Sequence, residues 1–292
     1  MNSKLLEQRA KAFDYLFDAV VVTDMVGTII DWNKGAEHLY GYSKEEVLGR
    51  PVNILHVPED SDKVTDEVFS GINASGKWSG EIRMLHKDGH IGWIESICVP
   101  IYDDNEQMIG ALGINRDITK RIKEAEKLHR LAHCDQLTGI PNRYLLFDRI
   151  NHLIAQSERT QNSFALFYLD LDNFKTVNDT KGHLYGDAIL KETASRLEHC
   201  IRHSDTIARI GGDEFALVLE SFSDKKEISK MAEALIKAIS KPFVINEERW
   251  QINCSIGIAI YPDNGTTIND LLSKADAAMY KAKLKGRGTY EF

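Results

Sequence analysis

A pair of adjacent glycines between two apolar stretches constrains this chain more than any other feature. Residues 211–215 read Gly-Gly-Asp-Glu-Phe and lie between the stretches 208–210 and 216–219. Glycine adopts positive φ at little steric cost, and β-branched and apolar residues flank the pair, so the pattern predicts a β-hairpin with two acids at its turn. A carboxylate at such a turn suits a divalent cation or a phosphate-bearing ligand. A hairpin without any function remains an equally good interpretation of these residues alone.

The size and composition of the chain predict two ordinary globular domains. Its 292 residues are about twice a typical domain length. Hydrophobic residues make up 43% and charged residues 27%, which excludes a disordered chain. The formal net charge of −8 argues against a nucleic-acid partner, because phosphate neutralisation requires a basic surface.

No segment of the sequence predicts export or membrane insertion. Residues 1–17 carry charges throughout and lack the apolar centre of a signal peptide. No run of about 18 apolar residues occurs, so no membrane partner is expected. The four cysteines form no Cys-x-x-Cys pair, which is typical of reduced thiols rather than of disulfides or a zinc site. We therefore expect a cytoplasmic protein.

The first half of the chain predicts a small antiparallel sheet with flanking helices. Two short apolar stretches on either side of the turn 24–27 predict a hairpin. Ser43 and Glu46 form the pattern of a capping box, which predicts the start of a short helix. Three longer strands are expected after it, at 78–85, 90–102 and 108–116.

Residues 13–119 resemble a PAS domain over their whole length. The resemblance lies in four stretches taken in order: 32–42 (WNKGAEHLYGY), 77–81 (KWSGE), 86–89 (HKDG) and 116–119 (RDIT). It implies a sensor or dimerisation module, and many PAS domains hold a small molecule between sheet and helices.

The resemblance leaves the PAS ligand open. Light-sensing relatives attach flavin through a cysteine, but residues 48–60 contain none, so no photoadduct is expected. A non-covalent flavin in a pocket lined by Trp32, Asn33 or Trp78 is one candidate, and core packing is the alternative for both tryptophans. Haem bound through His56 is less favoured, because a lone histidine beside a proline is more often a surface residue.

Residues 120–134 predict a charged helix that links the two halves. Its apolar positions follow spacings of four, three and seven, as in a coiled-coil seam interrupted by His129: Ile118, Ile122, Ala125 and Ala132. Two or three heptads cannot hold a dimer alone. Joined to a dimerising sensor, such a helix can transmit a rotation or a register shift. The alternative is an amphipathic linker packed against its own domain.

The second half predicts an α/β domain with a cation site. Residues 164–172 form an apolar run too short for a helix, and the run ends in Asp170 and Asp172. This predicts a buried strand that delivers carboxylates at its C-terminal edge. If the Asp213 hairpin lies on a neighbouring strand, Asp170 and Asp213 jointly bind Mg²⁺, which prefers oxygen ligands and retains substrate phosphates. The arrangement suits phosphoryl or nucleotidyl transfer.

Residues 135–292 are similar to the GGDEF family of diguanylate cyclases, block by block. The matching blocks are 135–143 (with Ile140 where leucine is usual), 168–179, 182–187, 211–215 and 276–287. The resemblance implies a fold similar to nucleotidyl cyclase catalytic domains. It also implies the condensation of two GTP into cyclic di-GMP with Mg²⁺, or alternatively Mn²⁺.

The resemblance implies a metal and catalytic role for four residues. Asp170, the Leu171 carbonyl and Asp213 would hold the metal ion on the triphosphate. Asp170, Asp213 and Glu214 would be the catalytic residues, with Glu214 as a second metal contact or as the base for the ribose 3′-hydroxyl. Asp172 is open to a metal contact or to a structural hydrogen bond.

The resemblance also implies which residues bind the nucleotide. Asn178 and Asp187 would read the guanine edge, because a carboxylate accepts from two donors that adenine does not present together. Phosphate oxygens would be met by three side chains and by backbone amides: Lys175, Lys283 and Arg287, with the amides near Asn173 and Phe174. Lys283 and Arg287 are four apart, so we expect both on one face of a helix.

The product that the resemblance implies, cyclic di-GMP, requires a homodimer, and a further motif matches a feedback site. Each chain would bind one GTP while cyclic di-GMP joins two guanylates, so the PAS domain and linker helix would bring two half-sites together. Arg202 and Asp205 match the R-x-x-D site that binds product in many relatives, with Asp205 accepting from the base, whereas a local ion pair is the alternative.

We therefore expect a two-domain α/β (α+β) chain with four parts: a helical segment at 1–12, a PAS domain at 13–119, a helical linker at 120–134 and a GGDEF domain at 135–292. The function expected is that of a PAS-regulated nucleotidyltransferase. The alternative is a catalytically silent receptor for GTP or cyclic di-GMP.

Overall fold

The computed structural model describes residues 3–245 and 247–292, and its contacts divide the chain into two units. The first unit is Met1–Lys127 and the second is Leu128–Phe292. Each unit has its own sheet and its own hydrophobic core.

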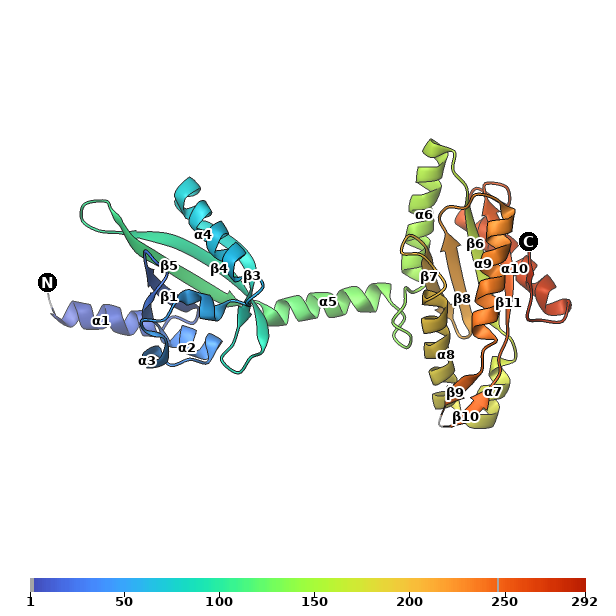
Figure 1. Cartoon of the computed structure of the whole chain (residues 1–292), viewed down its shortest axis with the longest axis horizontal. Helices are drawn as coiled ribbons and strands as arrows, with labels where there is room; N and C mark the ends of the chain where they lie inside the picture. Colours follow the sequence, from blue (N-terminus) through green and yellow to red (C-terminus); the bar gives the residue numbers. More distant parts are fainter. Residues whose placement is uncertain (1–2, 246) are drawn as a thin grey trace. The chain divides into compact units, whose positions relative to one another are not determined.

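The first unit contains a five-stranded antiparallel sheet in the order β2-β1-β5-β4-β3 (Figure 1). Its strands are β1 (Ala19–Asp24), β2 (Ile29–Trp32), β3 (Trp78–Leu85), β4 (Ile91–Tyr102) and β5 (Met108–Asp117). Helix α1 (Ser3–Asp14) precedes the sheet. Between β2 and β3 the chain forms four short elements: α2 (Lys34–Tyr40), α3 (Lys44–Val47), the 3-10 helix η1 (Val52–Leu55) and α4 (Ser61–Ser75).

Local signals in the sequence account for these elements. The β1–β2 hairpin turns at Gly27, whose φ of 82° favours glycine. Helix α3 begins with the predicted capping box between Ser43 and Glu46. The hairpin, the capping box and the three longer strands are therefore confirmed to within about one residue at their ends.

Helix α5 (Thr119–His133) follows β5 and contains the boundary between the two units. Its start is fixed by Thr119, whose hydroxyl accepts a hydrogen bond from the Trp93 amide at 2.8 Å. Within the described chain no residue of α5 is buried, and Leu128 is 66% exposed. This gives no support to the alternative that the helix packs against its own domain.

The second unit contains a five-stranded sheet in the order β12-β11-β6-β8-β7. The strands are β6 (Phe164–Leu171), β7 (Thr206–Gly211), β8 (Glu214–Leu219), β11 (Cys254–Tyr261) and β12 (Tyr290–Glu291). A separate two-stranded sheet joins β9 (Phe243–Ile245) and β10 (Glu248–Trp250). The helices are α6 (Arg143–Thr160), α7 (Phe174–Lys181), α8 (His183–Glu198), α9 (Lys225–Ile239) and α10 (Ile268–Leu284).

Helices cover both faces of this sheet, which explains why β6 reads as a continuous apolar run. Phe164 and Leu166 pack with α6 and α10, whereas Phe167 and Leu169 pack with α7, α8 and α9. Helix α10 comes unusually close to β11 at Gly257, where an added Cβ would lie 1.8 Å from the Ala275 carbonyl oxygen. The packing of α10 on β11 and β6 brings its last turn to the edge where β6 ends.

Candidate active site

The Gly-Gly turn joins β7 to β8, and the predicted hairpin is confirmed. Gly212 has a φ of 55°, which a residue with a side chain adopts only with strain. Arg209 fixes the turn, because its guanidinium donates to the Gly212 carbonyl oxygen at 2.7 and 3.0 Å. The same guanidinium donates to Asp135 at 3.0 Å, and the Arg209 side chain is only 12% exposed.

The Arg209–Asp135 pair is a positioning contact that sequence reasoning missed. Asp135 also accepts from the backbone and hydroxyl of Thr138. Burial alone would raise the pKa of the Asp135 carboxyl, but the hydrogen bonds from Thr138 and Arg209 outweigh burial and hold this pKa below its ordinary value. Two features of the sequence could have indicated this ion pair. Asp135 opens the first matched block, and Arg209 stands two residues before the glycines.

The proposed metal ligands meet at one edge of the sheet. Asp170 is opposite Glu214 in the β6–β8 register, and the Leu171 amide donates to the Asp213 carbonyl oxygen at 3.3 Å. Lys283 reaches the same point from α10, with its Nζ 2.7 Å from Asp170 Oδ1. The structure thus brings the Asp170 strand end and the Asp213 turn together, as the sequence predicted.

The electrostatics of this edge suit a cation. Burial raises the pKa of the Asp170 carboxyl, the Lys283 hydrogen bond opposes this, and the charges of Asp213 and Asp172 raise the pKa further. The raised pKa of Asp170 reflects burial first and the neighbouring carboxylates second, and the Lys283 ammonium offsets them only in part. Carboxylate and carbonyl oxygens are the donors that Mg²⁺ prefers, so the residues fit this ion.

Asp172 makes structural hydrogen bonds, which favours one of its two interpretations. Its side chain is buried, Ser255 Oγ donates to Oδ1 at 2.8 Å, and the Gly288 amide donates to Oδ2 at 3.0 Å. Both carboxylate oxygens are therefore engaged. Through them Asp172 fixes the chain just beyond α10 against β6.

Lys283 and Arg287 do not share a helix face, and that expectation was wrong. Helix α10 ends at Leu284, and Gly286 and Arg287 have φ values of 118° and 64°. Gly286 favours the end of the helix, so the helix stops before it reaches Arg287. Arg287 instead lies near the β6 edge through a loop, with its Nε 3.9 Å from Asp172 Oδ1.

Glu214 is held by a neighbouring strand. The hydroxyl of Tyr168 donates to Glu214 Oε2 at 3.1 Å. Burial and the adjacent Glu214 charge raise the pKa of Tyr168, so the hydroxyl remains a donor at neutral pH. Tyr168 does not engage the other carboxylate oxygen, Glu214 Oε1, which is therefore available to bind a cation or to accept a proton.

The predicted base-reading residues lie on α7 and α8. Asn178 Oδ1 is buried and has no hydrogen-bond partner among the described residues, a state that costs free energy unless a ligand supplies a donor. Gly186 makes room for this side chain, because an added Cβ would lie 1.9 Å from Asn178 Oδ1. Asp187 follows Gly186 directly and is half-buried.

The remaining predicted nucleotide contacts lie at the start of α7. Asn173 is exposed, with a φ of 59°, and Lys175 is exposed on the first turn. The Phe174 side chain is 6% exposed and belongs to the core, so only its backbone amide is open to a phosphate.

The structure alters the expected roles of Arg202 and Asp205. Asp205 is buried and accepts from the backbone amides of Arg202 at 3.0 Å and Glu220 at 3.4 Å. Its carboxylate is thus engaged and fixes the loop rather than facing a ligand. The Arg202 side chain is 62% exposed and forms an ion pair with Glu227 at 3.0 Å. The alternative expectation, an ion pair between the side chains of Arg202 and Asp205, was therefore wrong.

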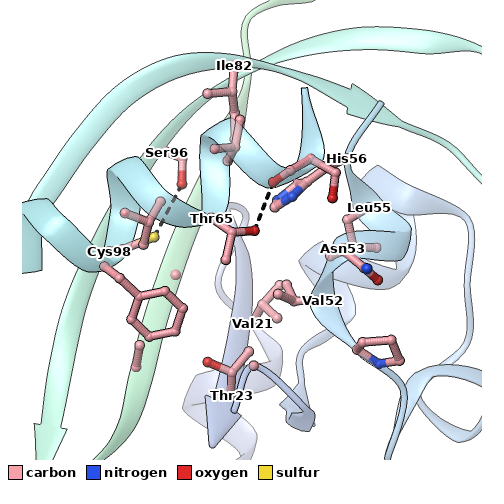
Figure 2. A pocket seen from close by; sticks show the side chains of 18 of the residues that line it. Val21, Thr23, Val52, Asn53, Leu55, His56, Thr65, Ile82, Ser96 and Cys98 are labelled. Atoms are coloured by element: carbon pink, nitrogen blue, oxygen red, sulfur yellow. Dashed lines mark hydrogen bonds between the residues drawn. The ribbon is translucent and has the colours of Figure 1, made fainter. Parts of the chain in front are cut away.

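The three predicted PAS ligand residues do not line the main cavity of the first unit. Trp32 is a core residue whose Nε1 donates to the Tyr42 carbonyl oxygen at 3.3 Å. Asn33 is fully buried, caps α2 and accepts from the Val20 amide at 2.8 Å. Trp78 packs against Gly71 of α4 and Gly80. His56, which was expected at the surface, is half-buried and lines this cavity (Figure 2).

Comparison with known proteins defines the class. Residues 132–289 match the family model described as diguanylate cyclase, GGDEF domain, and residues 29–115 match that of the PAS fold. The chain therefore belongs to the GGDEF family and carries a PAS domain before its GGDEF domain. No described helix is both long enough and apolar enough to cross a membrane.

Individual relatives support this assignment. The bifunctional diguanylate cyclase/cyclic di-GMP phosphodiesterase MucR of Pseudomonas aeruginosa is 45% identical over 60% of this chain and 25% of its own length. The probable diguanylate cyclase DgcE of Escherichia coli is 30% identical over 99% of this chain and 26% of its own length. The chain thus spans about a quarter of each of these relatives.

A solved structure supports the fold of the second unit. The GGDEF domain of TpbB from Pseudomonas aeruginosa is 34% identical, covers 55% of this chain and 93% of its own, and superposes with a TM-score of 0.53.

Proposed function

We propose that the chain is a PAS-regulated diguanylate cyclase. The observation that carries the proposal is the unpartnered Asn178 Oδ1 beside Gly186 and Asp187, in the same unit as the Asp170 and Asp213 strand ends. A buried acceptor without a donor suits the amino and imino hydrogens of a guanine. Two acidic strand ends suit a metal-bound triphosphate.

The chain's own residues would bind and orient GTP. Asn178 and Asp187 would hold the base, while Lys175, Arg287 and the amides at Asn173 and Phe174 would contact the phosphates. Asp170, Asp213 and the Leu171 carbonyl would hold Mg²⁺ or Mn²⁺, which when bound neutralises triphosphate charge and polarises the α-phosphate. Lys283 would exchange its contact with Asp170 for a phosphate oxygen.

The chemistry would take place between two chains. Each ribose 3′-oxygen forms a bond to the α-phosphorus of the partner's GTP, and the bond from that phosphorus to pyrophosphate breaks. The proton of each hydroxyl passes to Glu214 Oε1, while Tyr168 fixes Oε2. The PAS domain and the exposed positions of α5 would form the homodimer.

Product would inhibit the enzyme through Arg202. The guanidinium is exposed and charged, so it can bind phosphate or stack on guanine. Asp205 would act by fixing the loop that carries Arg202, and Glu227 would compete with the product for the guanidinium.

The test is to incubate the purified chain with Mg²⁺ and GTP and to measure pyrophosphate and cyclic di-GMP. We expect both in a two-to-one ratio, and a turnover per chain that rises with protein concentration as dimers form. Asp179→Asn is the matched control, because Asp179 is an exposed acid on α7 outside the proposed ligand set. Tight GTP binding without product at high protein concentration would refute the cyclase and support the silent receptor.

A further inference from the structure

The turn that joins β3 to β4 carries two histidines and an aspartate. Among the described residues, His86, Asp88 and His90 are the one group of three histidine, cysteine or acidic side chains whose ligand atoms all lie within 4.8 Å of one another. The His86 amide donates to the His90 carbonyl oxygen at 3.0 Å, so the hairpin fixes the two histidines side by side. His90 lies just outside the matched stretch 86–89, and the proposed function gives this group no role.

The ring nitrogens of both histidines converge on one carboxylate oxygen. Nδ1 of His86 lies 2.8 Å from Oδ1 of Asp88, and Nδ1 of His90 lies 2.6 Å from the same oxygen. The two rings are stacked, with their centroids 4.2 Å apart. All three atoms carry lone pairs, so each short contact needs a proton or a cation between nitrogen and oxygen.

A backbone contact disfavours a proton at one of these positions. The Asp88 amide donates to Nδ1 of His86 at 3.2 Å, and a nitrogen that accepts this hydrogen bond has no proton to offer Oδ1. The 2.8 Å contact then joins two electron-pair donors that repel each other. A cation bound to both atoms removes the repulsion and takes the place of the amide, which is free to bond to water because Asp88 is exposed.

Packing orients the His86 ring before any ion binds. The side chain is only 20% exposed, and its Nε2 edge packs so closely against Gly41, at the end of α2, that no Cβ fits there. The Lys87 amide donates to the Tyr40 carbonyl oxygen at 2.9 Å, which ties the turn to α2. A ligand ring whose rotamer is fixed loses little conformational entropy when it binds a metal.

The donor set distinguishes between kinds of metal ion. Two imidazole nitrogens and one carboxylate suit Zn²⁺ and the neighbouring divalent transition ions, whereas Mg²⁺ and Ca²⁺ prefer oxygen donors alone. Bonds of about 2.0–2.1 Å to zinc place tetrahedral ligand atoms about 3.3 Å apart, so the present contacts must widen by about half an ångström. The exposed side chains of Asp88 and His90 permit this movement and leave the fourth position to water.

We propose that His86, Asp88 and His90 bind one divalent transition-metal ion such as Zn²⁺, through Nδ1 of each histidine and Oδ1 of the aspartate. The ion joins the two ends of the β3–β4 turn, so it stabilises the folded first unit against unfolding. All three ligands belong to the first unit, and the inference is independent of the proposed cyclase function.

The test is a calorimetric titration of the full chain, without a histidine tag and freed of metal, with Zn²⁺ in a millimolar excess of Mg²⁺. The Mg²⁺ occupies sites made of oxygen donors, such as the proposed catalytic edge. We expect one Zn²⁺ per chain with a dissociation constant of about 1–100 μM, and a higher unfolding temperature in its presence. A chain that shows no saturable binding in this range would overturn the inference.

Two variants and a matched control locate the ion. Asp88→Asn and His90→Gln each remove one ligand from an exposed position, and each should weaken Zn²⁺ binding about tenfold or more. His152→Gln is the control, because His152 is exposed on α6 with only Asp148 beside it, at 3.5 Å. Native affinity in Asp88→Asn and His90→Gln, or an equal loss in the control, would contradict the assignment.

A second histidine pair and the cysteines are the competing sites. His129 and His133 are stacked on α5 with centroids 4.3 Å apart, so His133→Gln should leave Zn²⁺ affinity unchanged. Co²⁺ in place of Zn²⁺ should show visible d–d bands without the ultraviolet charge-transfer band of a thiolate ligand. Lost affinity in His133→Gln, or a thiolate band, would place the ion elsewhere and overturn the inference. Zn²⁺ binding by a chain that makes no cyclic di-GMP would refute the cyclase proposal alone.

Discussion

The two units use polar groups in opposite ways. The cavity of the PAS domain has a mostly apolar wall, and beside it His56 Nδ1 is buried with no hydrogen-bond partner among the described residues. The GGDEF domain gathers charges at the edge of a sheet, where Asp170, Asp213 and Lys283 meet. At that edge the Lys283 ammonium lies 2.7 Å from Asp170 and offsets part of its charge, whereas the inside of a cavity penalises any charge that lacks a partner.

This difference means that the two units suit ligands of different kinds. A mostly apolar wall suits a ligand with little charge, whereas acidic strand ends suit a cation and the phosphates that it binds. The following predictions test the charged side of this comparison, in the second unit.

The largest effect is expected from Asp213→Asn. Loss of one metal-binding carboxylate should lower turnover by about a thousandfold, since a bound metal contributes several kcal/mol to charge stabilisation. Cyclic di-GMP formation under saturating GTP measures it. Near-native turnover would refute the metal assignment.

A smaller effect is expected from Gly186→Ala. The added methyl group overlaps Asn178 Oδ1, which should displace that side chain and raise the dissociation constant for GTP about tenfold. Equilibrium binding of GTP measures the change. In an Asn178→Ala background the same substitution should add little, and additive effects in the double variant would show that Asn178 is not the residue displaced.

Arg209→Met tests whether the turn depends on its buried ion pair. We expect a loss of about 1–3 kcal/mol in the free energy of unfolding, because Asp135 is left without its partner. Urea unfolding at pH 7 measures this loss, and Arg159→Met, at an exposed arginine of α6, is the control. Equal stability of the two variants would contradict the positioning role.

The same pair predicts a dependence on pH. The pKa of Asp135 is depressed in the folded chain, so its contribution to stability is present above its unfolded pKa of about 3.9 and is lost as pH falls through the folded value. The difference in stability between native chain and Arg209→Met should therefore shrink in acid. A difference that is constant from pH 7 down to about pH 3 would exclude this origin.

The smallest effect is expected from Glu227→Gln. Removing the charge that pairs with Arg202 should tighten product inhibition about twofold to fivefold, because exposed pairs contribute little. Arg202→Ala should relieve inhibition without loss of turnover, and inhibition curves with added cyclic di-GMP measure both. Unchanged inhibition in Arg202→Ala would place the product elsewhere, whereas weaker inhibition in Glu227→Gln would mean that Glu227 positions the guanidinium.

Much of the second unit could be predicted because its signals are local or linear. The glycine turn, the acids that end β6 and the family blocks that contain Asn178 and Asp187 were all visible in the sequence, and the structure places the two strand ends together. Arg287 shows where prediction from residue spacing fails. Its distance of four residues from Lys283 predicted a shared helix face, but the glycines beyond Leu284 end the helix first.

In the first unit the strands could be predicted from the sequence, but the residues that line the cavity could not. Its strand pattern and capping box followed from periodicity and from local hydrogen bonds. The resemblance to PAS domains implied a ligand pocket, and Trp32, Asn33 and Trp78 were the candidates to line it. They instead pack or cap, since a cavity depends on which small residues face it, as Ala111 and Gly113 do.

The sequence by itself determined the class of this protein, its strands and the acids at the edge of its second sheet, because these depend on short spacings and on residue types. Only the tertiary structure decided that Arg209 holds the turn, that Asp172 and Asp205 are engaged by hydrogen bonds, and that His56 lines a mostly apolar cavity. Burial and hydrogen-bond partners arise from segments far apart in the chain, so no local pattern records them.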